Sequence, residues 1–322
     1  MKAAVYYETG TPDVFRYEDV ADPQPGPGEI LVEIAAVSIE GGDTLNRLAG
    51  PMTATPHVVG YQASGTVLAL GDGASRFAVG DRVVTVNLSG SHAEQRTVNE
   101  SFAWAVPDNL DLNEAACIPV PYGTAHDCLF EFGRLQSGET ALIHAGAGGV
   151  GIAAIQMAKQ AGARVLATAS SDERLERLRP FGLDDGINYA TNDFVAECRR
   201  ITGGQGANVI VDSVGGANLQ GSLAALAYRG RCITVGDAGR GGGEPIDVSG
   251  LRGNNQSLTG VFLGGELFSG TRAYGVVADQ IQAVAAGTLK VVIDRTFPLA
   301  EAAEAHRYIE SRQAFGRVLL IP

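Results

Sequence analysis

The first third of the chain is patterned as short apolar runs separated by turn residues. Apolar positions alternate in part with polar ones over residues 29–37, 63–70 and 80–86, which is typical of strands in a sheet with one buried face. The connector at residues 22–28 contains three prolines, and these cannot donate hydrogen bonds to a sheet ladder. This region therefore predicts a mainly β, barrel-like domain.

Near Pro121 the pattern changes to apolar strands that alternate with helical segments. Strands are expected at residues 140–144, 163–168, 208–212 and 231–235, and the first two helices at residues 150–160 and 172–181. Alternation with short connections predicts a parallel, doubly wound sheet with right-handed crossovers. We expect the last segment to return to the first domain, with helices at residues 274–286 and 301–311 and a strand at 316–321.

Length and charge narrow the classes of protein. A chain of 322 residues is long enough for two domains that each bury a core. Its formal net charge of −12, from 24 basic and 36 acidic residues, argues against nucleic acid or an anionic membrane as a partner. No run approaches the roughly 20 apolar residues that cross a bilayer. Residues 1–8 carry a charge before any long apolar run, so we expect no signal peptide there. We expect a cytoplasmic protein.

The four cysteines, Cys117, Cys128, Cys198 and Cys232, lie far apart and form no Cys-x-x-Cys pair. This spacing argues against both a disulfide framework and a structural zinc lobe. We expect four buried free thiols, as in a reducing compartment.

A glycine-rich turn follows the first strand of the second region. Gly146, Gly148 and Gly151 have the spacing Gly-x-Gly-x-x-Gly between a predicted strand and a predicted helix. In such turns the first glycine permits the tight turn, the second lets backbone approach a pyrophosphate, and the third lets the helix pack on the strand. Backbone N–H groups at the helix N-terminus then bind the phosphates. The turn predicts a dinucleotide site that includes Ala147, Gly149 and Val150.

The end of the next strand indicates which dinucleotide binds. An NAD site usually places a carboxylate there, whereas this strand ends at the small, neutral Ser170 and Ser171, followed by Asp172 as an expected helix cap. Arg174 is placed to reach a 2′-phosphate, and such a contact of roughly 1.5–3 kcal/mol favours NADP(H) about ten- to a hundredfold. Tyr189 is placed to offer a hydroxyl to the same phosphate. The alternatives are that Arg174 is a solvated charge on the helix surface and that Tyr189 is a core tyrosine.

The motifs taken in order resemble the medium-chain dehydrogenase/reductase superfamily, specifically its zinc-free quinone oxidoreductase (zeta-crystallin-like) family. They lie at residues 25–29, 43–50, 60–65, 79–83, 90–94, 144–151, 212–215 and 316–320. The resemblance implies an α/β fold, with a GroES-like mainly β catalytic domain at residues 1–121, completed by 265–322. A Rossmann NADP-binding domain at residues 122–264 is inserted before the last segment. The active site is expected in the cleft between the two domains.

The same resemblance assigns further residues. It places Thr124 as a cofactor-contacting threonine, and Gly236 and Phe262 near the nicotinamide. Ser170, Ser171, Arg174 and Tyr189 match the family's 2′-phosphate pocket. Residues 38–43 correspond to the loop that lines the reactive ring. The family often forms homodimers through Rossmann edge strands, and residues 257–263 are the expected edge here.

The zinc ligands of related dehydrogenases are replaced in this chain. By alignment of the motifs, their Cys, His and Cys correspond to Glu40, Tyr61 and Val120, which cannot form a three-ligand zinc site. His57 and His92 have no partner at ligand spacing. Without a Lewis acid to stabilise an alkoxide, a quinone or an α,β-unsaturated carbonyl is the easier hydride acceptor. The anion that hydride addition leaves has its negative charge delocalised onto oxygen through the conjugated system.

Glu40 and Tyr61 are the candidate proton donors. The family commonly has Asn where Glu40 stands, and one hypothesis is a buried acid with a raised pKa. The alternative is a carboxylate that faces solvent or pairs with Arg47. For Tyr61 the alternative is a packing role.

Three functions remain open from the sequence. The leading interpretation is an NADPH-dependent, metal-independent reductase of quinones or conjugated carbonyls. An enoyl-thioester reductase and an NADPH-binding sensor with little turnover are the alternatives.

The glycine-rich segment 237–244 is expected to form a mobile loop beside the cofactor, with Arg240 solvated.

Overall fold

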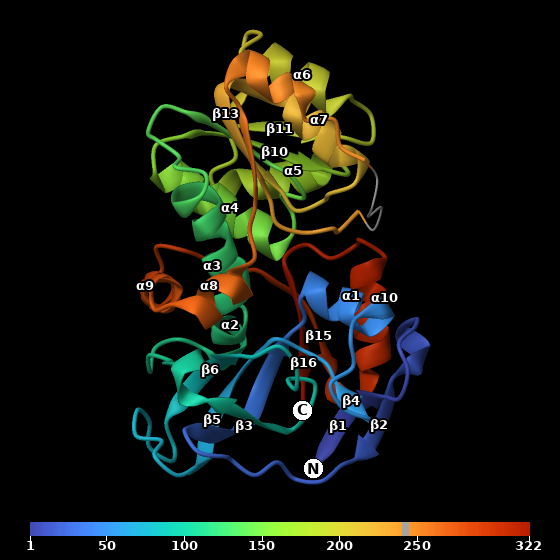
Figure 1. Cartoon of the computed structure of the whole chain (residues 1–322), viewed down its shortest axis with the longest axis vertical. Coiled ribbons are helices and arrows are strands. Elements are labelled where there is room, and N and C mark those ends of the chain that lie inside the picture. Colours follow the sequence, from blue (N-terminus) through green and yellow to red (C-terminus); the bar gives the residue numbers. More distant parts are fainter. Residues whose placement is uncertain (240–244) are drawn as a thin grey trace. The chain divides into compact units, whose positions relative to one another are not determined.

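The computed structural model describes residues 1–239 and 245–322, so Arg240 lies outside the described residues. The chain divides into two compact units, one of residues 1–120 with 266–322 and the other of residues 121–265. The limits expected from the sequence lie one residue away at each junction. Both units combine helices with sheets, which confirms the α/β fold class (Figure 1).

The first unit is built on two sheets. The smaller sheet has the order β2-β1-β4, with β1 Lys2–Tyr6, β2 Arg16–Asp19 and β4 His57–Val58. The larger has the order β15-β16-β3-β5-β6-β8, and β7 also pairs with β3. Its strands are β3 Glu29–Ser38, β5 Gln62–Leu70, β6 Arg82–Val86, β7 Gln95–Asn99, β8 Ala103–Ala105, β15 Ile293–Pro298 and β16 Arg317–Ile321.

The C-terminal segment completes this larger sheet. Strand β16 pairs antiparallel with β3, which sets Leu319 opposite Ser38. Alternation along β3 turns Ile30 and Val32 into a core with Val67. The helices of the unit are α1 Gly41–Ala49, α2 Leu112–Ala116, α8 Leu263–Ser269, α9 Arg272–Ala285 and α10 Ala302–Glu310. Short 3₁₀ turns lie at Pro12–Val14, Glu100–Phe102 and Leu299–Glu301.

The second unit contains a six-stranded parallel sheet with the order β11-β10-β9-β12-β13-β14. Counted from its first strand this order is 3-2-1-4-5-6, the arrangement of dinucleotide-binding Rossmann domains. Its strands are β9 Thr140–Ile143, β10 Arg164–Ala169, β11 Asp185–Asn188, β12 Ala207–Asp212, β13 Leu226–Thr234 and β14 Ser257–Gly260.

Helices cover both faces of that sheet. These are α4 Gly149–Gln160, α5 Asp172–Leu178, α6 Phe194–Ile201 and α7 Ala217–Ala225; the chain also forms α3 Pro119–His126 and short turns at Asp127–Glu131, Arg179–Phe181 and Ser249–Asn254. Side chains of α6 and α7 pack on Leu142 and Leu166, while α4 and α5 lie on the other side (Figure 1). Helix α5 ends earlier than expected because Pro180 cannot continue an α-helix.

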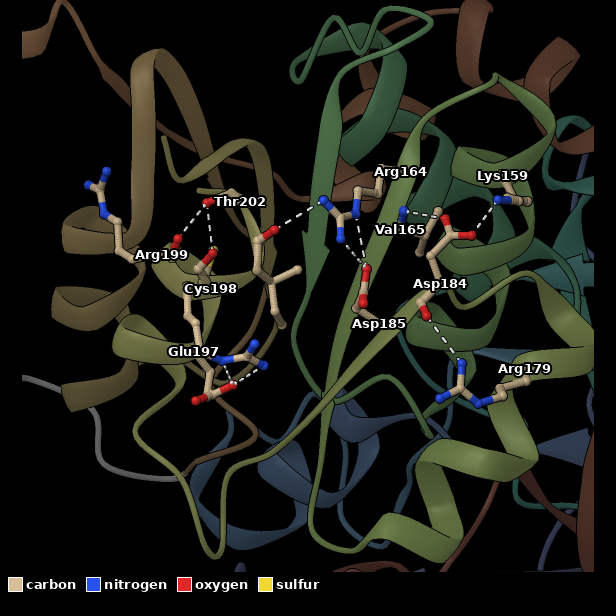
Figure 2. Close-up of polar contacts among 12 residues, drawn as sticks. Lys159, Arg164, Val165, Arg179, Asp184, Asp185, Glu197, Cys198, Arg199 and Thr202 are labelled. Carbon is tan, nitrogen blue, oxygen red and sulfur yellow. Dashed lines mark hydrogen bonds and ion pairs between the residues drawn. The ribbon is translucent and has the colours of Figure 1, made fainter. Parts of the chain in front are cut away.

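Ion pairs tie together the amino-terminal edge of the sheet (Figure 2). Arg164 at the start of β10 pairs with Asp185 at 2.8 Å, and Lys159 pairs with Asp184 at 2.6 Å. The carboxylate of Asp184 also accepts a hydrogen bond from the Val165 N–H at 2.9 Å. Because these charges are partly exposed, each pair contributes about 1 kcal/mol or less. The glycine turn lies at the opposite, carboxyl edge.

The four cysteines are buried free thiols, which confirms the expectation from their spacing. Within the described parts of the chain, no helix is both long and apolar enough to cross a membrane.

Candidate functional site

The glycine turn joins β9 to α4 and is shaped by residues other than the expected ones. Ala145, and not Gly146, has the positive φ, at 49°. Gly146 is required for another reason, since a Cβ there would lie 2.9 Å from the Cβ of Ala167 on β10. The role expected for the first glycine was therefore wrong: it permits close packing on the neighbouring strand, while the turn itself falls one residue earlier.

Gly151 lets the helix lie directly against the turn. A Cβ at this position would be 2.4 Å from the carbonyl oxygen of Ala145. Helix α4 begins at Gly149, and the N–H groups of Gly149, Val150 and Gly151 have no carbonyl within the helix to bind. The first two residues are partly exposed, so these donors can meet an anion there. Ala147, by contrast, is buried in the turn.

The ends of β10 and β11 bring four predicted phosphate ligands to one edge. Ser170 follows β10 and is exposed, and the backbone N–H of Tyr189 donates to the carbonyl of Ala169 at 3.1 Å. The Tyr189 side chain is 48% exposed, which rules out a core tyrosine. Arg174 lies in the first turn of α5, after Ser171.

The cap of α5 is Ser171 and not Asp172. The Ser171 hydroxyl accepts a hydrogen bond from the N–H of Arg174 at 3.3 Å, since Ser171 has the extended backbone of a cap. Asp172 instead accepts from the side-chain amide of Asn188 at 3.1 Å. The expectation for Asp172 was therefore wrong by one position. The carboxylate next to the predicted phosphate ligands is bound to the side-chain amide of Asn188.

The remaining predicted cofactor residues lie in separate places of the second unit. Gly236 follows β13, and its carbonyl oxygen packs against Gly215 of the neighbouring loop. Phe262 follows β14 and is 63% exposed. Both therefore lie at carboxyl ends of strands of the parallel sheet. Thr124 is buried within α3.

A buried chain of polar side chains connects the strand ends beneath this edge, and its role was not predicted from the sequence. Ser222 on α7 donates to Asp212 at 2.7 Å and lies 3.0 Å from Nε2 of His144. The other ring nitrogen of His144 lies 3.1 Å from the hydroxyl of Thr168. Burial lowers the pKa of His144 to about 4, so the ring is neutral. His144 and Asp212 both belong to sequence motifs of the family, at residues 144–151 and 212–215, and these motifs were the only local indication that the two residues matter.

Asp212 also shapes the loop after β12. Its carboxylate accepts hydrogen bonds from the N–H groups of Val214 and Gly215, both at 2.9 Å. The chain Thr168–His144–Ser222–Asp212 thus joins the carboxyl ends of β10, β9 and β12. We infer that it holds the backbone from which the glycine turn projects.

In the first unit, Glu40 is a buried acid. Its side chain is about 7% exposed, and its Oε1 accepts hydrogen bonds from Arg317 on β16 and Gln62 on β5. Arg47 pairs instead with Glu310, so the alternative of a solvent-facing or Arg47-paired Glu40 was wrong. Burial raises the pKa of Glu40 to about 7, against the opposing effects of Arg317 and Gln62.

Asp43 and Tyr61 lie beside this carboxyl group. The Asp43 carboxylate accepts from the backbone N–H groups of Glu40 and Tyr61, at 2.8 and 3.1 Å. Burial raises the pKa of Asp43 to about 8, although both hydrogen bonds oppose the rise. The Tyr61 hydroxyl accepts from Asn46 at 3.0 Å, and burial raises the pKa of Tyr61. A Cβ at Gly42 would be 2.4 Å from the Tyr61 ring, so this ring both packs and hydrogen-bonds.

Comparison with known proteins shows which family the chain belongs to. Residues 26–108 match the alcohol dehydrogenase GroES-like domain, and residues 149–296 match the zinc-binding dehydrogenase domain. A 2-haloacrylate reductase of Burkholderia sp is 35% identical over 99% of this chain and 98% of its own length. The human quinone oxidoreductase is 31% identical, over 100% of this chain and 98% of its own. The chain belongs to the zinc-free quinone oxidoreductase family.

A solved member of this family has the same fold over the whole chain. The structure of the Escherichia coli quinone oxidoreductase complexed with NADPH has a TM-score of 0.93 and 28% identity, covering 100% of both chains. In this quinone oxidoreductase-family chain, the glycine turn has backbone N–H donors at the start of α4, and the residues predicted to bind the 2′-phosphate lie at the ends of β10 and β11.

The second matching family model describes zinc-binding dehydrogenases, but this chain lacks their zinc ligands. At the positions of the zinc ligands, Glu40 is bound to Arg317, the Tyr61 hydroxyl is bound to Asn46, and Val120 has an apolar side chain. This donor set does not fit zinc. Among the residues that the structure describes, no group of three His, Cys, Asp or Glu side chains is arranged to hold a metal ion.

His57 and His92 are both buried in the protein interior. His92 lies 3.0 Å from His306, ring nitrogen to ring nitrogen, and burial lowers the pKa of His92 to about 3. His57 packs against the ring of Tyr6.

Proposed function

We propose that this chain is an NADPH-dependent, metal-independent reductase that transfers a hydride to a quinone or an α,β-unsaturated carbonyl. The observation that carries the proposal is the carboxyl edge of the parallel sheet. There the open N-terminus of α4 and the group Ser170, Ser171, Arg174 and Tyr189 share one edge. The NADPH complex of a family member and the named reductases among the relatives support it.

The choice of NADPH over NADH rests on charge at the end of β10. The position where NAD sites carry a carboxylate is Ser170, and the nearby Asp172 is bound to Asn188. Arg174 supplies a cation within the first turn of α5, and Tyr189 offers an exposed hydroxyl. We assign both to the 2′-phosphate. Thr124, Gly236 and Phe262 complete the proposed cofactor site.

The chemistry needs a hydride and a proton. NADPH supplies the hydride when bound. Transfer to a conjugated acceptor leaves an enolate or a hydroquinone anion, which must be protonated. Glu40 is the proposed proton donor: with a pKa raised to about 7, it is in part protonated at neutral pH. Its O–H bond breaks, the acceptor anion takes the proton, and water restores the carboxyl group. Tyr61 is the second candidate donor.

The direct test measures NADPH consumption against quinones, enones and enals, with a metal chelator present. We expect turnover with at least one of these acceptors and a marked preference over NADH. A strong preference for NADH over NADPH would refute the assignment of Arg174 to the 2′-phosphate. Binding of NADPH without turnover of any acceptor would refute the reductase and favour a sensor.

One relative favours a second acceptor class. The 2-haloacrylate reductase has 35% identity to this chain, which is reason to add 2-haloacrylates to the panel. Enoyl thioesters belong in the same panel, because they too present a conjugated carbonyl. Acceptor preference is then read from kcat/KM across the panel.

We also propose a homodimer in the cytoplasm. Strand β14 is the last strand of the parallel sheet, so one of its edges is available for pairing with a second copy. Tyr228 on the adjacent strand is 65% exposed. Light scattering of the purified chain tests the dimer, and a monomer at all concentrations would refute it.

A further inference from the structure

Residues on two strands donate hydrogen bonds to the same oxygen of the Glu40 carboxyl group. Gln62 on β5 donates through its Nε2, and Arg317 on β16 donates through a guanidinium nitrogen, both to Oε1. An oxygen that accepts two such donors cannot at the same time point an acid proton at them. A proton on Glu40 must therefore reside on Oε2.

The orientation of Gln62 is set by the backbone. The N–H of Val120 donates to the side-chain oxygen of Gln62 at 2.9 Å. Because the oxygen of the amide is engaged there, its NH₂ group points toward Glu40. Glu40 and Val120, which occupy two of the positions of zinc ligands in related dehydrogenases, are thus linked through Gln62.

Arg317 is equally fixed. Its guanidinium donates to the Ser38 hydroxyl at 2.7 Å and to the Ile39 carbonyl at 2.6 Å, besides Glu40. These acceptors are at the end of β3 and just after it, and β16 pairs with β3 at Ser38. The side chain is 91% buried, so it has little freedom to follow a displaced carboxylate.

We propose that Arg317 and Gln62 are positioning residues that place the acid proton of Glu40 on Oε2 and direct it to the hydride acceptor. This inference rests on the proposed function, with Glu40 as proton donor. The Oε2–H bond breaks as the enolate or hydroquinone anion forms its new bond to hydrogen. The carboxylate that remains is stabilised by Arg317 until water returns a proton.

Other titratable groups lie around the same carboxyl group. Asp43 on α1 is the nearest acid, and Cys117 follows α2; burial raises the pKa of both. Tyr61 precedes β5, and Arg96 on β7 interacts with Asp43. Arg317 and Gln62 are the groups that oppose the effect of burial on Glu40 directly, so their removal must favour its protonated form.

The test titrates Glu40 directly, in the full-length chain with NADP⁺. Selective ¹³C labelling of glutamate carboxyl carbons, with Glu40→Gln for assignment, reports the midpoint of protonation by NMR. We expect Arg317→Met and Gln62→Leu to raise the midpoint by about one pH unit or more, a roughly tenfold change in proton affinity. Arg317→Lys keeps the positive charge, so we expect its midpoint of protonation to lie close to that of the wild type. Arg307→Met is the control, since this exposed arginine also pairs with carboxylates.

The same variants are then assayed across pH with the best acceptor. The inflection of kcat on the alkaline side is expected to follow the titration midpoint in each variant and to vanish in Glu40→Gln. A midpoint that does not move, or a midpoint that moves without the inflection, overturns the inference. If Arg317→Met does not fold, Gln62→Leu decides. Absence of turnover with every acceptor refutes the proposed function instead, and the titration still decides whether the two donors act on Glu40.

Discussion

Replacing Glu40 with glutamine should change how the stability of the first unit depends on pH. Burial raises the pKa of this carboxyl group from 4.5 to about 7. Below pH 4.5 the group is protonated in both the folded and the unfolded chain, and its contribution to stability is fully present. As the pH rises through about 7, the folded chain must bury a carboxylate and that contribution is lost.

The magnitude follows from the size of the pKa change. The difference is about 2.5 pH units, and at about 1.36 kcal/mol per unit it corresponds to about 3 kcal/mol. Glu40→Gln removes this titration while nearly preserving the shape of the side chain. Between pH 4.5 and mildly alkaline pH, the free energy of unfolding of the variant should therefore fall by about 3 kcal/mol less than that of the wild type. At every pH the variant is expected to be less stable overall, because Arg317 then has no carboxylate to pair with.

The chain carries a suitable probe for this measurement. Trp104 is the single tryptophan, it is buried in the first unit, and it stacks on Tyr274. Urea unfolding followed by tryptophan fluorescence thus reports the unit that contains Glu40. Asp43 titrates in the same direction in both proteins, and because Glu40 raises its pKa, the substitution can only reduce the pH dependence further. Parallel pH dependences for wild type and Glu40→Gln would refute the reasoning.

Three further predictions concern the second unit. Arg174→Ala should raise the KM for NADPH about ten- to a hundredfold and leave that for NADH nearly unchanged; an equal effect on both would remove Arg174 from the 2′-phosphate. Gly151→Ala should lower the free energy of unfolding by about 1–3 kcal/mol, because its Cβ would meet backbone at 2.4 Å; Gly275→Ala, with nothing within 4 Å, is the calorimetric control. Ser222→Ala should cost about 1–3 kcal/mol and weaken NADPH binding in a titration, because Asp212 loses a buried donor; unchanged binding would limit Ser222 to a structural role.

Local patterns predicted most of the secondary structure. The strand at residues 140–144 and the helix at 150–160 correspond to β9 and α4, since apolar periodicity reflects which face of an element is buried. Errors arose where one residue competes with the pattern. Pro180 ends the α-helix early, and Ser171 takes the capping position that was expected of Asp172.

The candidate site could be predicted only in part. The glycine turn and the end of β10 are each a short continuous stretch of sequence, so their residues could be named as candidate ligands. The polar chain from Thr168 to Asp212 could not, because Ser222 lies on a helix far along the chain and carries no motif. In the same way, two explanations for Glu40 remained open, since nothing local reveals whether a carboxylate is buried.

By itself the sequence determined the class of fold, the family and the position of the candidate nucleotide-binding turn, because periodicity and motif spacing are properties of neighbouring residues. Only the tertiary structure decided the state of Glu40. Arg317 reaches this carboxyl group from 277 positions away, through the pairing of β16 with β3. Burial and charge pairing depend on which distant segments share a sheet, and these together set the proton affinity of the group.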